Sequence, residues 1–175
     1  MSKIKVICAN AVTPNGYIAR EDDREDFLPY EGWTEFLEEA KRYDNFIVGR
    51  NTFDVVGRLY EGFGYDDVEA KHKIIVTSRK DFSMPGYVVV HSPEEALEYL
   101  EGQGVEAALL IGGSKLNSAF AQQKLIDVLE LTVSPYLLGT GRPQFYPAEF
   151  EAGLELDKCE QLSGGRIKLT YNVIY

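Results

Sequence analysis

The sequence predicts an α/β fold with a mostly parallel central sheet, an antiparallel C-terminal strand and flanking helices. Short apolar runs rich in Val, Ile and Leu recur along the chain, and segments with helical periodicity separate most of them. Strands joined through helices run parallel, and the final strands are expected to pair antiparallel. The 175 residues fit one domain, residues 1–175, large enough to bury roughly 70% of its unfolded surface.

Strands are expected where apolar, β-branched runs are bounded by glycine, proline or polar residues. These runs are Lys3–Asn10, Phe46–Gly49, Ile74–Thr77, Tyr87–Val90, Ala107–Ile111, Leu129–Leu138 and Lys168–Tyr175. Pro135 lies inside the sixth run. Because proline donates no backbone hydrogen bond, it predicts a bulge or a sheet edge there. The last run alternates in the manner of a half-buried strand.

Helices are predicted by apolar residues three and four positions apart and by capping signals. The clearest apolar face is formed by Trp33, Phe36, Leu37, Ala40 and Tyr43. Two further helices are expected to begin at Arg50 and after Gly113. The segment Ser92–Glu95 matches a capping box with proline in the first helical position, and Gly102 ends that helix. Between these elements we expect a turn at residues 13–16, an exposed acidic loop at residues 21–26 and a loop at residues 60–67.

The composition excludes several classes of function. A net charge of −10 argues against a nucleic-acid partner, because such partners require clustered Lys and Arg. The chain has neither an apolar run of the ~20 residues that span a bilayer nor a signal-like N-terminus, so we expect a cytoplasmic protein without a membrane partner. Cys8 and Cys159 lie far apart, and the two histidines lack metal-ligand spacing. No metal site is therefore expected.

A double glycine provides the strongest functional signal. The run Ala107–Ile111 breaks at Gly112 and Gly113, and a helical pattern begins at once. Glycine accepts positive φ and lets a pyrophosphate approach the backbone closely. The amides at the start of the following helix favour an anion. An isolated double glycine also fits a tight turn without a ligand, so the interpretation depends on the neighbouring strand ends.

Two other strand ends carry residues that suit phosphate. Gly49–Thr52 combines a glycine with a cation and a hydroxyl at a helix start, and Thr77–Lys80 places two hydroxyls and two cations after a strand. Ligands of open α/β sheets bind beyond the carboxyl ends of the strands. The three strand ends together predict a site for a dinucleotide with an additional 2′-phosphate.

Five stretches also match a known family in their order and spacing, and they cover nearly the whole chain. These stretches are Thr13–Ala19, Val48–Phe53, Val76–Arg79, Ile111–Leu116 and Leu137–Gly141. The chain resembles the dihydrofolate reductase-like superfamily. It is most similar there to the reductase (C-terminal) domain of the riboflavin-biosynthesis deaminase/reductase proteins.

The resemblance implies an NADPH site. It implies that Gly49, Arg50 and Thr52 bind the cofactor phosphates, that Ser78 and Arg79 hold the 2′-phosphate, that Gly112, Gly113 and Ser114 cradle the pyrophosphate, and that Ala9 and Ile18 line the nicotinamide site. Within the matching stretches it adds Thr77, Ile111, Lys115 and Leu116. The cofactor carries the hydride chemistry, while the protein orients it against the substrate and excludes water.

The chain departs from the family pattern at two acidic positions. Riboflavin-pathway reductases commonly carry Glu before the double glycine and Asp before the early glycine, whereas this chain has Ile111 and Asn15. The zinc-deaminase signature of the bifunctional proteins is absent. Glu31 follows Leu28–Pro29 with an offset similar to that of the substrate carboxylate of dihydrofolate reductases. Glu31 is thus the candidate catalytic residue, and it fits equally well as an exposed first residue of the helix.

These observations predict an NADPH-dependent reductase that transfers a hydride to a small heterocyclic substrate, such as a ribosylamino-pyrimidine or a pterin. Two alternatives stay open: a dihydrofolate or pterin reductase, and a non-catalytic NADP-binding protein. The resemblance also implies a homodimer. Apolar strands expected near the C-terminal sheet edge would cover it, with Leu131, Val133, Tyr136, Leu137 and Leu138 on one and Tyr171, Val173 and Tyr175 on the other.

Overall fold

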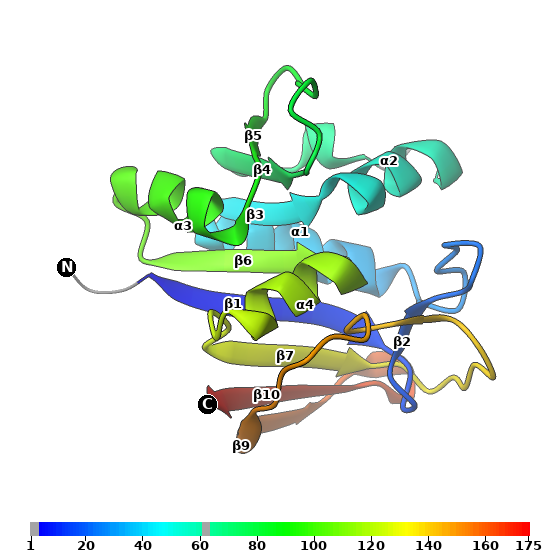
Figure 1. Cartoon of the computed structure of the whole chain (residues 1–175). Coiled ribbons are helices and arrows are strands. Elements are labelled where there is room, and N and C mark those ends of the chain that lie inside the picture. Colours follow the sequence, from blue (N-terminus) through cyan, green and yellow to red (C-terminus); the bar gives the residue numbers. More distant parts are fainter. Residues whose placement is uncertain (1–3, 61–63) are drawn as a thin grey trace.

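The fold is built around one large sheet, seen in a computed structural model that describes residues 4–60 and 64–175 (Figure 1). The sheet has eight strands in the order β5-β4-β3-β6-β1-β7-β10-β9. Their bounds are β1 (Lys5–Val12), β3 (Asn45–Gly49), β4 (His72–Val76), β5 (Val88–Val90), β6 (Ala107–Gly112), β7 (Val128–Val133), β9 (Gly153–Gln161) and β10 (Ile167–Ile174). Only β10 pairs antiparallel among the described strands of this sheet, with β7 on one side and β9 on the other. The predicted fold class is confirmed.

Helices cover both faces of the sheet. The helices are α1 (Glu31–Tyr43), α2 (Arg50–Leu59), α3 (Pro93–Gly102) and α4 (Ser114–Gln122), with short 3₁₀ turns at Tyr65–Asp67 (η1) and Ser163–Gly165 (η2). One apolar core joins the sheet to α3 and α4 and contains Leu100 and Phe120. A second core on the other face joins it to α1 and α2 and contains Ala40 and Val56. The two layers fix the strand ends that form the site.

A small two-stranded sheet lies beside the main one. It pairs β2 (Tyr17–Ala19) with β8 (Arg142–Pro143) in antiparallel orientation. The turn that leads into β2 is closed by Asn15, whose side-chain amide donates to the Leu138 carbonyl at 2.6 Å. Segments more than a hundred residues apart in sequence thus meet where β1 ends.

Several predicted elements shift by a few residues, and one prediction is wrong. The strand expected over Leu129–Leu138 ends at Val133, so Pro135 lies beyond it rather than inside. Proline cannot donate to a strand ladder, and pairing with β1 stops at Val12. Lys3, the first residue of the first predicted strand, lies outside the described residues, as do residues 61–63 of the predicted 60–67 loop. Within that loop, η1 forms at residues 65–67.

The sheet edge differs from the predicted one. β7 lies between β1 and β10, so it is an interior strand, and β9 forms the edge. The sequence predicted no strand at Gly153–Gln161. Nearly all of its residues are exposed, so the segment lacks the apolar alternation that marks a half-buried strand.

The cysteines and the acidic side chains bear on the expectation that the chain has no metal site. Cys8 is buried in the core, and burial raises the pKa of its thiol to about 12. Among the described residues, no group of three or more His, Cys, Asp or Glu side chains is placed to hold a metal ion. None of the helices in residues 4–60 and 64–175 is long and apolar enough to cross a membrane.

Candidate cofactor and substrate site

The carboxyl ends of four adjacent parallel strands form one edge of the sheet. β4, β3, β6 and β1 are neighbours, so the segments that follow them lie side by side. These segments open onto a cavity of about 1780 Å³. It is lined by thirteen of the predicted cofactor residues, namely Ala9, Ile18, Gly49, Arg50, Thr52, Thr77, Ser78, Arg79, Ile111, Gly113, Ser114, Lys115 and Leu116. The fourteenth, Gly112, is buried and does not line the cavity.

Each residue of the double glycine disfavours a side chain for a different reason. Gly112 has a φ of +99°, whereas Gly113 has a φ of −85°, and the peptide bond between them is cis. A Cβ atom on Gly113 would lie 2.6 Å from Oγ1 of Thr52. A Cβ atom on Gly112 would lie 3.4 Å from Nδ2 of Asn10. Glycine is therefore favoured at position 112 by its positive φ and at position 113 by the close approach of the Thr52 side chain.

Two helices begin at the cavity without a side-chain cap. Gly49 is the N-cap of α2 and Gly113 is the N-cap of α4, and neither position has a side-chain capping hydrogen bond. The first amides of a helix then point outward, and the helix dipole adds partial positive charge. Both features favour an anion such as a phosphate at this edge of the sheet.

The two predicted phosphate-binding arginines lie at the same edge. Arg50 pairs with Asp54 at 2.6 Å, and Arg79 pairs with Asp81 at 3.0 Å. The Arg79 side chain is 55% exposed, and exposed ion pairs contribute only about 0–1 kcal/mol. The backbone amide of Arg79 donates to Oγ1 of Thr77, which holds the turn after β4. A phosphate can therefore replace Asp81 at little cost.

An amide network joins β1 to the double glycine. The Asn10 side chain donates to the Ile111 carbonyl at 3.3 Å and accepts from Nδ2 of Asn117 at 2.9 Å. The hydroxyl of Ser114 donates to the Pro143 carbonyl. These bonds fix the position of the glycine turn. The backbone amide of Ser114, the first residue of α4, is the group at this turn that suits an anion.

Aromatic side chains form one wall of the cavity. Tyr65 stacks on Phe53 with ring centroids 5.9 Å apart and contacts Trp33 and Phe36 of α1 at the same spacing. Trp33, Phe36 and Tyr65 line the cavity. Flat aromatic surfaces of this kind suit a planar ring. Tyr65 lies in a segment that the sequence predicted only as a loop, so no pattern pointed to its place in the cavity lining.

Charged residues hold α1 in place beside this wall. Nη1 of Arg166 donates to Glu35 at 2.9 Å, and Nζ of Lys168 contacts both Glu39 and Glu130. Arg166 is 2% exposed, so its charge is buried and depends on this partner. The contacts join α1 to β10 and thereby position the aromatic side chains of the helix.

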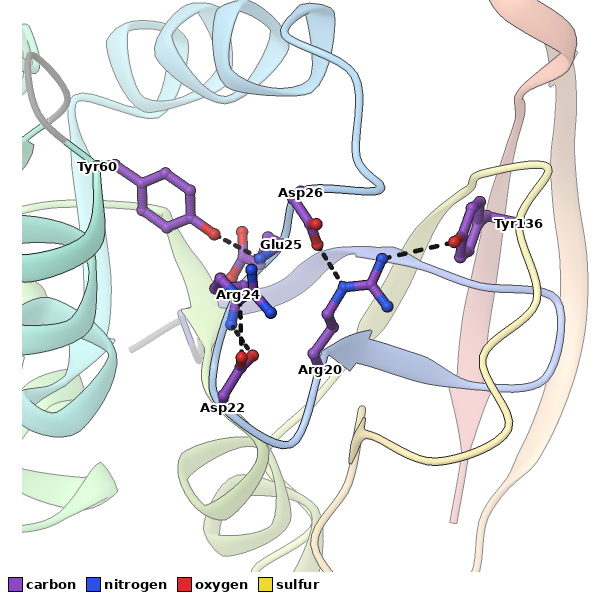
Figure 2. Close-up of polar contacts among 7 residues, drawn as sticks. All are labelled: Arg20, Asp22, Arg24, Glu25, Asp26, Tyr60 and Tyr136. Atoms are coloured by element: carbon purple, nitrogen blue, oxygen red, sulfur yellow. Dashed lines mark hydrogen bonds and ion pairs between the residues drawn. The ribbon is translucent and has the colours of Figure 1, made fainter.

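The loop after β2 is largely exposed, as predicted, but Asp23 and Glu25 are half-buried and the loop contributes to the cavity lining. Figure 2 shows the polar contacts around Glu25. Glu25 is half-buried and lines the cavity. Burial, together with the nearby charge of Asp23, raises the pKa of the Glu25 carboxyl to about 7. The backbone amide of Glu25 donates to the Tyr60 hydroxyl, which fixes the loop against the end of α2.

Glu31 lies elsewhere. It is exposed at the first position of α1 and is absent from the cavity lining. It borders a separate pocket of about 170 Å³ with Phe27 and Tyr136. A general acid must come within hydrogen-bond reach of the atom it protonates. The structure does not bring Glu31 to the predicted cofactor residues, so the geometry fits its alternative as an exposed helix residue.

Residues 4–168 match the RibD C-terminal domain family. The chain belongs to this family. It is 29% identical over 175 residues to the uncharacterized protein YwjB of Bacillus subtilis, covering 95% of this chain and 97% of that protein. Membership in the RibD C-terminal domain family supports an oxidoreductase.

Two solved structures show the same fold. A putative riboflavin biosynthesis protein from Shewanella sp. PV-4 superposes with a TM-score of 0.79 at 24% identity, covering 98% of this chain and all of that one. Dihydrofolate reductase from Enterococcus faecalis, complexed with NADP(H) and RAB-propyl, superposes with a TM-score of 0.70 at 21% identity, covering 97% and 96%. The fold is thus dihydrofolate reductase-like, as the sequence resemblance predicted.

The structure explains one departure of this RibD C-terminal domain from the family pattern. Asn15 accepts from the Thr13 hydroxyl at 2.9 Å and donates to the Leu138 carbonyl at 2.6 Å. An ionised aspartate has no N–H group with which to make the second bond. Ile111 contributes an apolar residue to the cavity lining. Neither position supplies an acid in this chain.

Proposed function

We propose that this RibD C-terminal domain is an NADPH-dependent reductase that transfers a hydride to a small heterocyclic substrate. The observation that carries the proposal is the meeting of three strand ends at one cavity. Two of them begin uncapped helices at Gly49 and Gly113, and the third carries Arg79. When bound, NADPH supplies the hydride.

Each part of the cavity has a proposed task. The amides at the starts of α2 and α4 bind the pyrophosphate, with the Arg50 and Thr52 side chains beside them. Ser78 and Arg79 bind the 2′-phosphate, which selects NADPH over NADH. Ala9 and Ile18 form the apolar surface for the nicotinamide and exclude water from it.

The aromatic wall supports a planar heterocycle as the substrate. Tyr65, Trp33 and Phe36 come from two different elements, contact one another and line the cavity. Stacking on such rings contributes about 0.5–1.5 kcal/mol per pair beyond the burial of apolar area. A volume of about 1780 Å³ exceeds a typical single-ligand pocket of roughly 300–1,000 Å³ and so accommodates both cofactor and substrate.

Two successive measurements test the proposed reductase function. Fluorescence titration first shows whether NADPH binds, and NADPH oxidation is then followed with pterins, ribosylamino-pyrimidines and quinones. Oxidation with one heterocyclic class supports the reductase and identifies its substrate. Tight NADPH binding without oxidation of any substrate indicates a non-catalytic NADP-binding protein. Lack of NADPH binding overturns the proposal.

We also propose a homodimer formed through the β9 edge. Exposed apolar side chains gather on β9 and at the end of β10, where Leu156 is 55% and Ile174 is 53% exposed. Unpaired sheet edges with apolar residues are normally covered, and a two-fold interface does so most often. Light scattering at micromolar concentration should give twice the chain mass. A mass of 19.7 kDa would contradict the dimer.

A further inference from the structure

The loop after β2 carries five acidic residues: three lie in ion pairs, Glu21 is exposed and outside the cavity lining, and Glu25 lines the cavity. Figure 2 shows two of the ion pairs beside Glu25. The three pairs are Asp22 with Arg24 at 2.8 Å, Asp26 with Arg20 at 2.5 Å and Asp23 with Arg142 at 2.8 Å. Within residues 4–60 and 64–175, the carboxyl of Glu25 has no ion pair or hydrogen bond. Arg20 and Arg24, the arginines nearest to Glu25 in sequence, thus form ion pairs with other acids.

The carboxyl without an ion pair belongs to a half-buried residue that lines the cavity. Glu25 lines the cavity together with Tyr60 and Tyr65. Burial, and after it the charge of Glu25, raises the pKa of Tyr65, in keeping with the place of both residues in the cavity lining. An acid held without a cationic partner beside a flat apolar surface is typical of a functional group rather than a stabilising one.

The backbone around Glu25 is fixed on both sides. Its amide donates to the Tyr60 hydroxyl, and its carbonyl accepts from the Leu28 amide at 2.9 Å. The Arg20 amide donates to the Arg24 carbonyl at 2.8 Å, which closes the loop. The Glu25 side chain therefore extends from a constrained backbone. A catalytic acid needs such a fixed position to come within reach of a substrate atom.

We infer that Glu25 is the acid that protonates the substrate, an inference that rests on the proposed reductase function. The substrate class it fits is a heterocycle with a reducible C=N bond. Neither Asn15 nor Ile111 offers a carboxyl, and Glu31 lies outside the cavity. Glu25 lines the same cavity as the aromatic wall, and its carboxyl can hold a proton for transfer to the substrate.

The step balances in atoms and electrons. Reduction forms a C–H bond from the hydride and its electron pair, which NADPH supplies, and breaks the C=N π bond. The electron pair of that bond passes to nitrogen, and the carboxyl proton of Glu25 forms the N–H bond there. Glu25 is left as a carboxylate and regains a proton from solvent at the cavity mouth. The substrate gains two hydrogens, and NADPH is oxidised to NADP⁺.

The charged groups around Glu25 decide its protonation. On its own loop Asp23 opposes ionisation, although Arg142 of β8 partly neutralises it. Asp22 and Asp26 lie in ion pairs, and the tyrosines at the end of α2 and in η1 stay neutral near pH 7. With a pKa of about 7, about half of the Glu25 carboxyls hold the proton at neutral pH.

The test compares Glu25→Gln with Glu21→Gln, a substitution of an exposed acid on the same loop that does not line the cavity. The assay uses whichever pterin or ribosylamino-pyrimidine the wild-type protein reduces fastest. Glu25→Gln should lower kcat/KM by about 100-fold or more and leave the Kd for NADPH unchanged, because a general acid contributes on that scale. Glu21→Gln should leave both unchanged.

The pH profile separates an acid from a merely structural side chain. Wild-type kcat/KM should be highest below pH 7 and fall as the pH rises through the pKa of Glu25, because the donor must be protonated. Glu25→Gln should lose this fall. A Gln variant that binds NADPH and keeps both the turnover and the falling profile would overturn the inference alone. A wild-type protein that binds NADPH yet reduces no substrate would overturn the proposed function and, with it, this inference.

Discussion

The amino-terminal ends of α3 and of the pair α2 and α4 differ in what satisfies their first amides. In α3 the Ser92 hydroxyl accepts from the Glu95 amide at 3.2 Å, and the Glu95 carboxylate accepts from the His91 amide at 2.7 Å. In α2 and α4 a glycine occupies the N-cap position, and no side chain accepts from the helix amides. The first amides of α3 are thus bonded by its own capping residues. The first amides of α2 and α4 have no side-chain acceptor and can donate to a ligand.

Helix starts without a side-chain cap give this edge of the sheet its proposed anion site. Helix starts capped by Ser or Asp gain about 1 kcal/mol over alanine. Gly49 and Gly113 forgo a side-chain cap at the very positions that border the cavity. The local sequence thus gives up some helix stability where an anionic ligand can supply the missing partner.

The largest effect is expected from Gly113→Val. The new Cβ would lie 2.6 Å from Oγ1 of Thr52, and a branched side chain would fill the space over the α4 amides. NADPH binding should be lost in a fluorescence titration. Gly57→Val, at an exposed position of α2 where a Cβ meets nothing within 4 Å, should leave binding unchanged. A folded Gly113→Val protein with normal NADPH affinity would remove the proposed pyrophosphate site.

Arg79→Ala should have the next largest effect. A charge-assisted hydrogen bond contributes roughly 1.5–3 kcal/mol, so the Kd for NADPH should rise about ten- to 150-fold. The Kd for NADH should change little, because NADH lacks the 2′-phosphate. Lys71→Ala, a change at the opposite end of β4, is the matched control. Equal losses for both cofactors would show that Arg79 does not bind the 2′-phosphate.

Gly49→Asp would give α2 a side-chain cap like the one that Ser92 gives α3. The backbone at Gly49 has an extended conformation, with φ at −74° and ψ at 141°, and a Cβ there meets only ordinary contacts at 3.6 Å or more. The carboxylate would cap the helix and repel the phosphates, so NADPH should bind about tenfold more weakly, equivalent to about 1.4 kcal/mol. Calorimetry should detect this loss. Gly49→Ser, which caps without charge, should lose less, and equal losses would argue against phosphate at α2.

The smallest effect on binding is expected from Ser92→Ala. Removal of the cap should lower the free energy of unfolding by about 1 kcal/mol. NADPH affinity should stay within a factor of about two, a difference of less than 0.5 kcal/mol. Urea unfolding and cofactor titration measure the two quantities. A variant with unchanged stability but weakened NADPH binding would place the ligand at α3 instead.

Regular patterns made most of the fold predictable from the sequence. The capping box at Ser92–Glu95 and the apolar runs of β3 and β6 predicted elements that the structure contains. β9 escaped prediction because both of its faces are exposed, and β7 ends early because pairing with β1 stops at Val12. Local patterns thus identify half-buried strands but not exposed ones.

The candidate site was predictable to a similar extent. The strand-end motifs indicated the cavity, since parallel order alone brings strand ends together. Glu25 could not be identified in this way, because its lack of a partner depends on Arg142, far away in sequence, binding Asp23. Glu31 has the expected offset in sequence, but its position on α1 turns it away from the cavity lining. Offsets along the chain do not fix direction in space.

Binding of NADPH at the starts of α2 and α4 is tested most directly by amide chemical-shift mapping. On titration with NADPH, the amides of Arg50–Thr52, Gly113 and Ser114 should shift most, because their N–H groups would donate to phosphate oxygens. The Glu95 amide should shift less, since the Ser92 hydroxyl already accepts from it. Saturating NADPH that leaves the α2 and α4 amides unshifted, or that shifts Glu95 most, would contradict the proposed site.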